Sequence, residues 1–238
     1  MYRKKTSSQL KQVARGLMIG KYRNAITVLL GYELILSTLT LLAAPTSTSL
    51  IGSIFGFIIN FIIVLLGSIL QVGQFSFYLN IACEQPYQLS DLFTGFKIHP
   101  DKIIITRLIS SFLTTLPLIP ALVVMIIAVY SHNMITILFI GCMLLILGSI
   151  LSWWIGLRFS QVHYLLLDFP EYSSRELLKM SWKLMKGNTG RLFYIQVSFL
   201  PLMLAGLLSF GIGLLFITPY QSMTHALFYL DIIQSKNI

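Results

Sequence analysis

The sequence predicts an all-α polytopic membrane protein: a transmembrane helical bundle of about six spans in three hairpins, each preceded by a cytoplasmic amphipathic helix. Of the 238 residues, 56% are hydrophobic and only 11% are charged, whereas soluble domains carry about 25% charged residues. Three long stretches, 34–83, 108–157 and 192–230, contain no Asp, Glu, Lys or Arg. One span needs about 20 apolar residues, so each stretch is too long for a single helix.

The expected spans form three hairpins within a single integral membrane domain that covers residues 1–238. The six helices are expected at 25–44 and 51–80, at 103–129 and 134–158, and at 191–208 and 211–231. The turns between partners, at 45–49, 131–133 and 209–210, contain no charged residue. The parts of the domain are then an N-terminal arm at 1–23, hairpin one at 25–80, and the second and third hairpins with their preceding helices at 86–158 and 171–231.

Basic residues gather on one side of this layout. The arm and the two long loops contain most of them: Arg3, Lys4, Lys5, Lys11, Arg15, Lys21, Arg23, Lys97, Lys102, Arg175, Lys179, Lys183, Lys186 and Arg191. Because short loops rich in Lys and Arg remain in the cytoplasm, we expect a cell-membrane protein with both termini inside. Contact with the anionic lipid headgroups of the bilayer then accounts for the net charge of +9, and nucleic acid is not an expected partner.

Apolar residues recur at helical spacing in the cytoplasmic segments 10–18, 89–96 and 177–185. Thr6 with Gln9, and Ser173 with Glu176, have the spacing of capping boxes. In the third segment, three lysines lie opposite the apolar residues, and we predict that they contact lipid headgroups; they are Lys179, Lys183 and Lys186. A compatible alternative is that these helices simply pack on the ends of the spans.

The order of a cytoplasmic helix followed by a hairpin recurs along the chain. A Tyr-Leu pair ends the second span of each unit, at 78–79, 164–165 and 229–230. The segment 17–20 (Leu-Met-Ile-Gly) matches 184–187 (Leu-Met-Lys-Gly), at an offset of 167 residues. This shared order predicts an internal duplication, although the Tyr-Leu pairs taken alone are also typical of an aromatic belt.

Residues that carry known chemistry form no recognisable set. The sequence contains no GxSxG, HExxH, P-loop or GxGxxG motif. The four histidines, at positions 99, 132, 163 and 225, are spread over different depths of the expected layout, whereas a metal needs converging ligands. We therefore expect a protein that is not an enzyme and that holds no metal or cofactor.

Glu33 is the one acid expected deep inside a span. It is the ninth residue of the helix expected over 25–44, which places it about 13 Å below the membrane surface. A charged carboxylate at this depth is costly unless it is paired or protonated. Arg107 and Arg158 are the candidate partners. Together they form either a proton or ligand site in the bundle or an ion pair that fixes helix register.

Prolines form a second group of candidates inside the expected spans. They are Pro117, Pro120, Pro201 and Pro219. Proline removes a backbone donor and kinks a helix, and transporters build binding sites from such broken helices. Prolines are also frequent in ordinary membrane helices, so both interpretations remain open.

Several short motifs follow one another along the chain: Asp91-Leu92-Phe93-Thr94-Gly95-Phe96, Leu184-Met185-Lys186-Gly187, Arg191-Leu192-Phe193, Gly211-Ile212-Gly213-Leu214-Leu215, Pro219-Tyr220 and Phe228-Tyr229. Taken in this order, they resemble a family of bacterial multi-pass membrane proteins, the domain-of-unknown-function family 975 (DUF975). The resemblance covers nearly the whole chain, although Pro120-Ala121 stands where the family tends to have Pro-Gly. It implies a membrane fold and no known activity, so no catalytic residue can be transferred.

The sequence favours transport or transport support as the function, with a small-molecule or protein partner that it does not identify. One alternative is an accessory or regulatory scaffold that docks a cytoplasmic partner or lipid; another is a membrane-embedded lipid enzyme. A transporter would have a polar cavity that reaches the middle of the membrane, lined by Glu33 and helix breaks. A scaffold would have a dry core and a conspicuous cytoplasmic patch, and an enzyme would cluster acids or histidines at one interface.

Overall fold

The structure, a computed structural model, describes residues 4–43, 49–131 and 133–236, and within these ranges it is helical and contains no strand. The elements are α1 (Ser7–Met18), α2 (Tyr22–Leu42), α3 (Leu50–Ala82), η1 (Leu89–Phe93), α4 (Thr94–Lys97), α5 (Pro100–Thr115), η2 (Leu116–Leu118), α6 (Ile119–Val129), α7 (Met134–Phe159), α8 (Val162–Asp168), α9 (Ser174–Met185), α10 (Thr189–Leu208) and α11 (Leu214–Gln234). The all-α prediction is confirmed. Arg3, His132 and most of the turn expected at 45–49 lie outside the described residues.

Five helical stretches are long and apolar enough to cross a membrane: Tyr22–Leu42, Ile51–Ala82, Pro100–Val129, Met134–Asp168 and Thr189–Leu208. Their outer surfaces are apolar, with Phe57 74% exposed and Ile135 85% exposed. A soluble monomer rarely exposes such a large apolar surface. The chain is therefore an integral membrane protein.

The sixth expected span, 211–231, corresponds to α11, which is not among these five stretches. Instead, α11 contacts α1, α2, α3 and α10. Met223, Phe228 and Tyr229 are completely buried in it. Protein encloses the half of α11 that contains these three residues. That half can therefore carry polar side chains that lipid would disfavour, and these lower the mean hydropathy of the helix.

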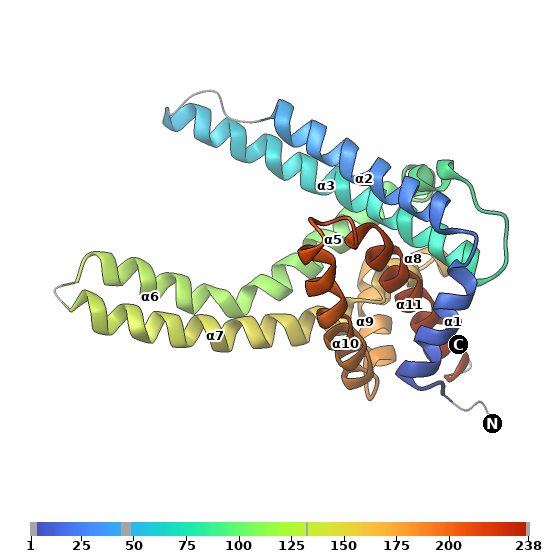
Figure 1. Cartoon of the computed structure of the whole chain (residues 1–238). Coiled ribbons are helices and arrows are strands. Elements are labelled where there is room, and N and C mark those ends of the chain that lie inside the picture. The colour runs from blue at the N-terminus through green and yellow to red at the C-terminus, as the bar shows by residue number, and fades with distance from the viewer. Residues whose placement is uncertain (1–3, 44–48, 132, 237–238) are drawn as a thin grey trace.

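Two long hairpins, α2–α3 and α6–α7, extend in diverging directions from a body that contains α1 and α8–α11 (Figure 1). The core lies in this body. The three repeated tyrosines, Tyr78, Tyr164 and Tyr229, are all buried there, and the rings of Tyr164 and Tyr229 stack at 5.0 Å. These tyrosines therefore belong to the core and not to an aromatic belt.

The first and third units share their local structure, as the predicted duplication requires. Helices α1 and α9 each have 12 residues and begin with a complete capping box, on Thr6 and on Ser173. Each helix ends in one extended residue, followed by a glycine with positive φ, +76° at Gly20 and +82° at Gly187. A positive φ is easy for glycine and strained for other residues, which explains why this position is a glycine in both segments.

The apolar faces of α1 and α9 pack against protein. Leu10, Ala14 and Met18 of α1 are buried, as are Leu177, Leu184 and Met185 of α9. This favours the alternative in which these helices sit on the ends of the spans. Lys179, Lys183 and Lys186 remain exposed on α9. The middle segment, expected as one two-turn helix over 89–96, is instead divided into η1 and the short α4.

The third and fourth expected spans are both interrupted. Pro117 and Pro120 lie where α5 gives way to η2 and then to α6. The fourth helix runs past its expected end at 158, breaks at Ser160–Gln161, and continues as α8. The other two prolines, Pro201 and Pro219, were also predicted as helix breaks, but α10 and α11 continue through them.

Candidate functional site

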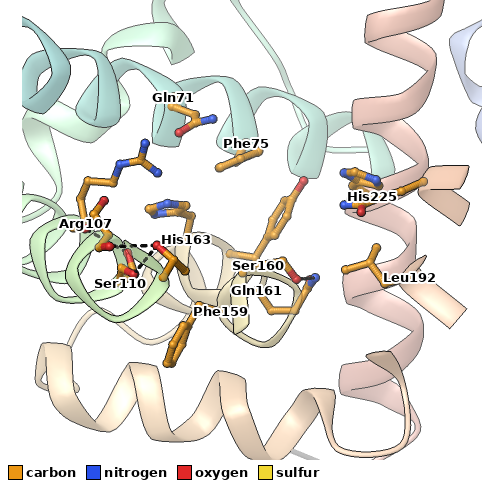
Figure 2. A pocket seen from close by; sticks show the side chains of 15 residues that line it. Gln71, Phe75, Arg107, Ser110, Phe159, Ser160, Gln161, His163, Leu192 and His225 are labelled. Atoms are coloured by element: carbon orange, nitrogen blue, oxygen red, sulfur yellow. Dashed lines mark hydrogen bonds between the residues drawn. The ribbon is translucent and has the colours of Figure 1, made fainter. Parts of the chain in front are cut away.

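A cavity of about 260 Å³ lies between α3, α5, the α7–α8 break, α10 and α11 (Figure 2). Eleven of its fifteen lining residues have polar side chains: Gln71, Arg107, Ser110, Ser111, Thr114, Ser160, Gln161, His163, Tyr164, Gln196 and His225. The other four are Phe75, Gly156, Phe159 and Leu192. Such a polar lining is unusual among membrane helices, where polar groups usually mark a functional site or an interhelical hydrogen bond.

One face of α5 supplies the floor of the cavity. Arg107, Ser110, Ser111 and Thr114 follow one another at the spacing i, i+3, i+4 and i+7, which places them on the same side of a helix. The hydroxyls of Ser110 and Thr114 donate to backbone carbonyls of α5, over 3.0 and 2.9 Å. Their oxygens therefore face the cavity as acceptors, while Arg107 contributes donors and a positive charge.

The α7–α8 break supplies a second wall. Ser160 donates its hydroxyl to the carbonyl of Leu157 over 2.8 Å, and the Gln161 amide donates to the Ser160 hydroxyl over 2.7 Å. The break turns the chain so that His163 and Tyr164, in the first turn of α8, also line the cavity. Without the interruption, the helical spacing of α7 would spread these four positions, all between 160 and 164, around the whole helix circumference.

The two histidines face the cavity from different helices. The ring of His163 stacks on Phe75, with centroids 5.6 Å apart, and lies beside Arg107, while His225 lies across the cavity near Leu192 (Figure 2). Within the part of the chain that the structure describes, no group of three or more His, Cys, Asp or Glu could hold a metal ion. The cavity therefore offers a solute hydrogen-bonding side chains and one positively charged side chain, that of Arg107.

Several buried polar atoms around the cavity have no hydrogen-bond partner among the described residues. They are Arg107 Nε, Gln161 Oε1, His163 Nδ1, Tyr164 Oη and His225 Nε2. Buried polar atoms in proteins are nearly always paired, with protein, water or a ligand. This concentration of unpaired donors and acceptors indicates a space shaped for a polar solute or for ordered water.

A second cavity, of about 280 Å³, lies between α2, α3 and α5. Its polar residues include Thr40, Asn60 and Ser68, and two of its lining residues, Gln71 and Arg107, also line the first cavity. On α3 the lining runs from Asn60 to Phe75, which corresponds to about 22 Å along the helix axis. The two cavities therefore adjoin at Gln71 and Arg107, and we refer to the pair of cavities as the polar track.

The structure does not bring Glu33, Arg107 and Arg158 together. Glu33 is exposed on α2 and forms no ion pair among the described residues, because the helix turns its neighbour Tyr32 toward the second cavity instead. Only Arg107 lines the cavities. Arg158 stacks on Trp154 and Trp182, at 4.8 and 5.1 Å from the ring centroids. The ion pair that the described residues do contain joins Arg191 to Asp231, at 2.7 Å.

Sequence reasoning missed most of the cavity. Gln71, His163 and His225 come from α3, α8 and α11, which are far apart in the chain, so no local pattern links them. One signal was visible: the polar face of α5, with four polar residues at helical spacing in an otherwise apolar span.

Comparison with known proteins gives a family match over the whole chain. The model of a family described as protein of unknown function (DUF975) matches residues 1–236. No curated protein and no solved structure is significantly similar to the chain.

Proposed function

This chain belongs to the DUF975 family, whose function is unknown, and we propose that it is a non-enzymatic protein of the cell membrane that takes part in transport. The observation that carries the proposal is the polar track formed by the two cavities that share Gln71 and Arg107. Transporters place their binding sites between helices, at breaks where backbone and side chains can contact a solute. The break between α7 and α8 likewise contributes Ser160 and Gln161 to the lining of this track.

The lining favours a small solute that is anionic or neutral and polar. Arg107 is the charged side chain among the described residues that line either cavity, so the track attracts negative charge and repels cations. The first cavity, at about 260 Å³, has room for roughly nine water molecules or one small organic anion. Serine, threonine and glutamine side chains would complete the hydrogen bonds of such a solute.

The proposed orientation places both termini and α9 in the cytoplasm, following the distribution of basic residues. A cysteine at Asn133 should then react with an impermeant thiol reagent on intact cells, and one at Gln88 should react only after the membrane is opened. Both positions are exposed, so failure to react would not result from burial. Labelling of the Gln88 variant on intact cells would overturn the orientation.

A scaffold that docks a partner or lipid on its cytoplasmic face is the second candidate. It is favoured by α9, which turns Lys179, Lys183 and Lys186 outward while its apolar face is buried. A scaffold of this kind needs no water-accessible track, so the two candidates differ in the accessibility of the cavity.

Cysteine accessibility tests the transport proposal. Ser110 and Thr114 would be replaced by cysteine in a Cys83→Ser/Cys142→Ser background, with Phe112→Cys as the matched control because Phe112 lies on the same helix and is 64% exposed on the apolar surface. We expect small charged methanethiosulfonate reagents to modify the cavity cysteines but not the control. The anionic reagent should react about tenfold faster than the cationic one, and Arg107→Gln should remove that preference.

The side from which the reagents act separates the candidates. In oriented vesicles, a transport protein should allow modification of the cavity cysteines from both sides, because its site alternates between them. Access from one side only, or no reaction beyond that of the control, would contradict the transport proposal and favour the scaffold.

A further inference from the structure

We propose that a groove between α5, η2 and α7 binds one acyl chain of an anionic phospholipid, whose phosphate is held by Arg158 at the end of the groove near α9. Of the residues that line the groove, only Phe159 also lines the polar track, and the site does not depend on the transport proposal.

The groove has a volume of about 380 Å³ and an apolar lining: Leu113, Leu116, Pro117, Leu151, Ile155, Phe159 and Trp182. On α7 the lining residues recur at every fourth position, at 151, 155 and 159, so the groove follows the helix for about 12 Å. At the other side, η2 opens the wall where the α5 helix is interrupted. A long, narrow apolar groove of this kind fits an extended acyl chain better than a compact solute.

The groove is continuous with the lipid-facing surface. Leu116 and Leu151, which line it, are 48% and 49% exposed, and the neighbouring Phe112 is 64% exposed. A lipid can therefore enter sideways from the bilayer, whereas a water-soluble peptide would have to cross it. This continuity is the reason to assign the groove to a lipid.

Arg158 lies at the end of the groove with its guanidinium held in place and mostly unused. The guanidinium stacks on the rings of Trp154 and Trp182, and Trp182 is itself a wall of the groove. Its Nη1 donates to the carbonyl of Trp182 over a long 3.4 Å, and its buried Nε has no hydrogen-bond partner among the described residues. A guanidinium has five N–H donors suited to two oxygens of one phosphate.

The position of Trp182 is fixed by the contact between α9 and the end of α7. The Ser181 hydroxyl donates to the Arg158 carbonyl over 2.8 Å, and Phe159 packs against the Trp182 ring at 5.4 Å. Tryptophan and arginine together at the end of a membrane helix are typical of the level of lipid headgroups. The acyl groove and the phosphate donor are therefore in register for one lipid molecule.

Two exposed lysines of the α9 segment add positive charge. Lys179 precedes Trp182 by three residues and so shares its face of the helix, and Lys186 directly follows the last residue of α9. Glu176, one turn before Lys179, is engaged by the hydroxyl and backbone N–H of Ser173 in the helix cap. The net charge around the mouth of the groove is therefore positive, which favours an anionic over a zwitterionic headgroup.

Quenching of Trp182 by brominated lipids tests the site. The Trp153→Phe/Trp154→Phe protein retains Trp182 as its single tryptophan and keeps an aromatic ring beside Arg158. It would be reconstituted with increasing fractions of phosphatidylglycerol or phosphatidylcholine that carry bromine on the acyl chains. We expect the anionic lipid to reach half-quenching at about a fivefold lower fraction, the effect of one basic residue near the surface.

Matched variants show which residues cause the preference for the anionic lipid. A protein with Trp153 as its single tryptophan should show no preference, because that ring packs on Phe193 of α10. Arg158→Gln should remove most of the preference at Trp182, Arg158→Lys should keep part of it, and Arg107→Gln in the polar track should leave it unchanged. Lys179→Gln/Lys186→Gln, on the protein surface, should reduce it even if the Arg158 variants fold poorly.

Three results would overturn the proposal. They are equal quenching of Trp182 by the two lipids, a preference that survives both Arg158→Gln and the double lysine variant, and an absence of quenching by either lipid. Since Arg107→Gln removes the charge preference of the polar track but not that of the groove, the two proposals can fail separately.

Discussion

Asp231 is a buried carboxylate that ties the N-terminal arm to α10 and α11, and its removal should be strongly destabilising. Its side chain is 1% exposed and lies 2.7 Å from Arg191, whose side chain is 23% exposed. The backbone N–H of Lys5 donates to its other oxygen over 3.0 Å, and Arg191 also donates to the Lys5 carbonyl. Three segments far apart in the chain therefore depend on one ion pair.

The expected loss in the free energy of unfolding follows from the burial of each partner of the ion pair. Removal of one member of a buried ion pair costs about 3–5 kcal/mol, because it leaves an uncompensated charge. Asp231→Asn should lie near the lower limit, at about 3 kcal/mol, because the stranded Arg191 is partly solvated and asparagine can still accept from Lys5. Arg191→Met should cost about 4 kcal/mol, because the Asp231 carboxylate, which loses this ion-pair partner, is almost fully buried.

A double-mutant cycle with Arg191→Met and Asp231→Leu separates the pair from simple loss of packing. The double variant should be less destabilised than the sum of the singles by about 2 kcal/mol, since neither charge is then stranded. Unfolding by SDS in mixed micelles, followed by tryptophan fluorescence, would measure the free energies, with the exposed Arg175→Met as control. Additive effects, or single effects below about 1 kcal/mol as at a surface pair, would refute the reasoning.

Three further predictions concern packing, an exposed acid and a helix cap. Gly95→Ala should lower the free energy of unfolding by about 1–3 kcal/mol, because a Cβ there would stand 2.2 Å from the carbonyl oxygen of Ile69, and the same micelle assay should detect the loss. Glu33→Gln should change stability by less than about 0.5 kcal/mol, since Glu33 is exposed and unpaired among the described residues; a larger loss would restore the predicted ion pair. The Ser173 hydroxyl and backbone N–H lower the pKa of Glu176, so its stabilisation is present above the ordinary value of 4.5 and is lost as the pH falls through the lowered pKa; the stability difference between the wild type and Glu176→Ala should shrink over that acid range, and a constant difference would contradict it.

The features predicted well from the sequence are those set by neighbours within a few residues. The capping boxes on Thr6 and Ser173 and the matching glycines at 20 and 187 all recur in the structure, because a cap needs only side chains three residues apart. The apolar stretches also correspond to helices, since lipid imposes composition on every turn.

The features that failed depend on the direction in which a helix face points. The helix that contains Glu33 was predicted correctly, but the side of the helix on which Glu33 lies was not. One residue corresponds to a rotation of about 100° around the helix axis, and Tyr32 faces the cavity instead. For the same reason the cavity could not be assembled from sequence, because His163 and His225 reach it from different helices. The pairing of Arg191 with Asp231 likewise crosses 40 residues.

The family motifs gain a structural meaning that the sequence alone did not give them. In the segment 91–96, Asp91 accepts from the Asn80 amide over 3.1 Å, Leu92 is buried, and Gly95 allows close approach to α3. The Gly187 of the second motif ends α9 at a positive φ. In this structure these residues hold the elements around the body in place, so they do not identify a solute.

The character of α11 explains why the polar track is possible in a protein so rich in apolar residues. A helix in contact with lipid cannot present His, Gln and Thr to its surroundings without a large cost, whereas a helix enclosed by protein can face them toward an internal cavity. The hairpins α2–α3 and α6–α7 present apolar surfaces outward, and α11 is surrounded by α1, α2, α3 and α10. The same enclosure that removes α11 from the apolar spans thus allows His225 to line the cavity opposite Arg107, where it faces the polar residues that α5 and the α7–α8 break contribute.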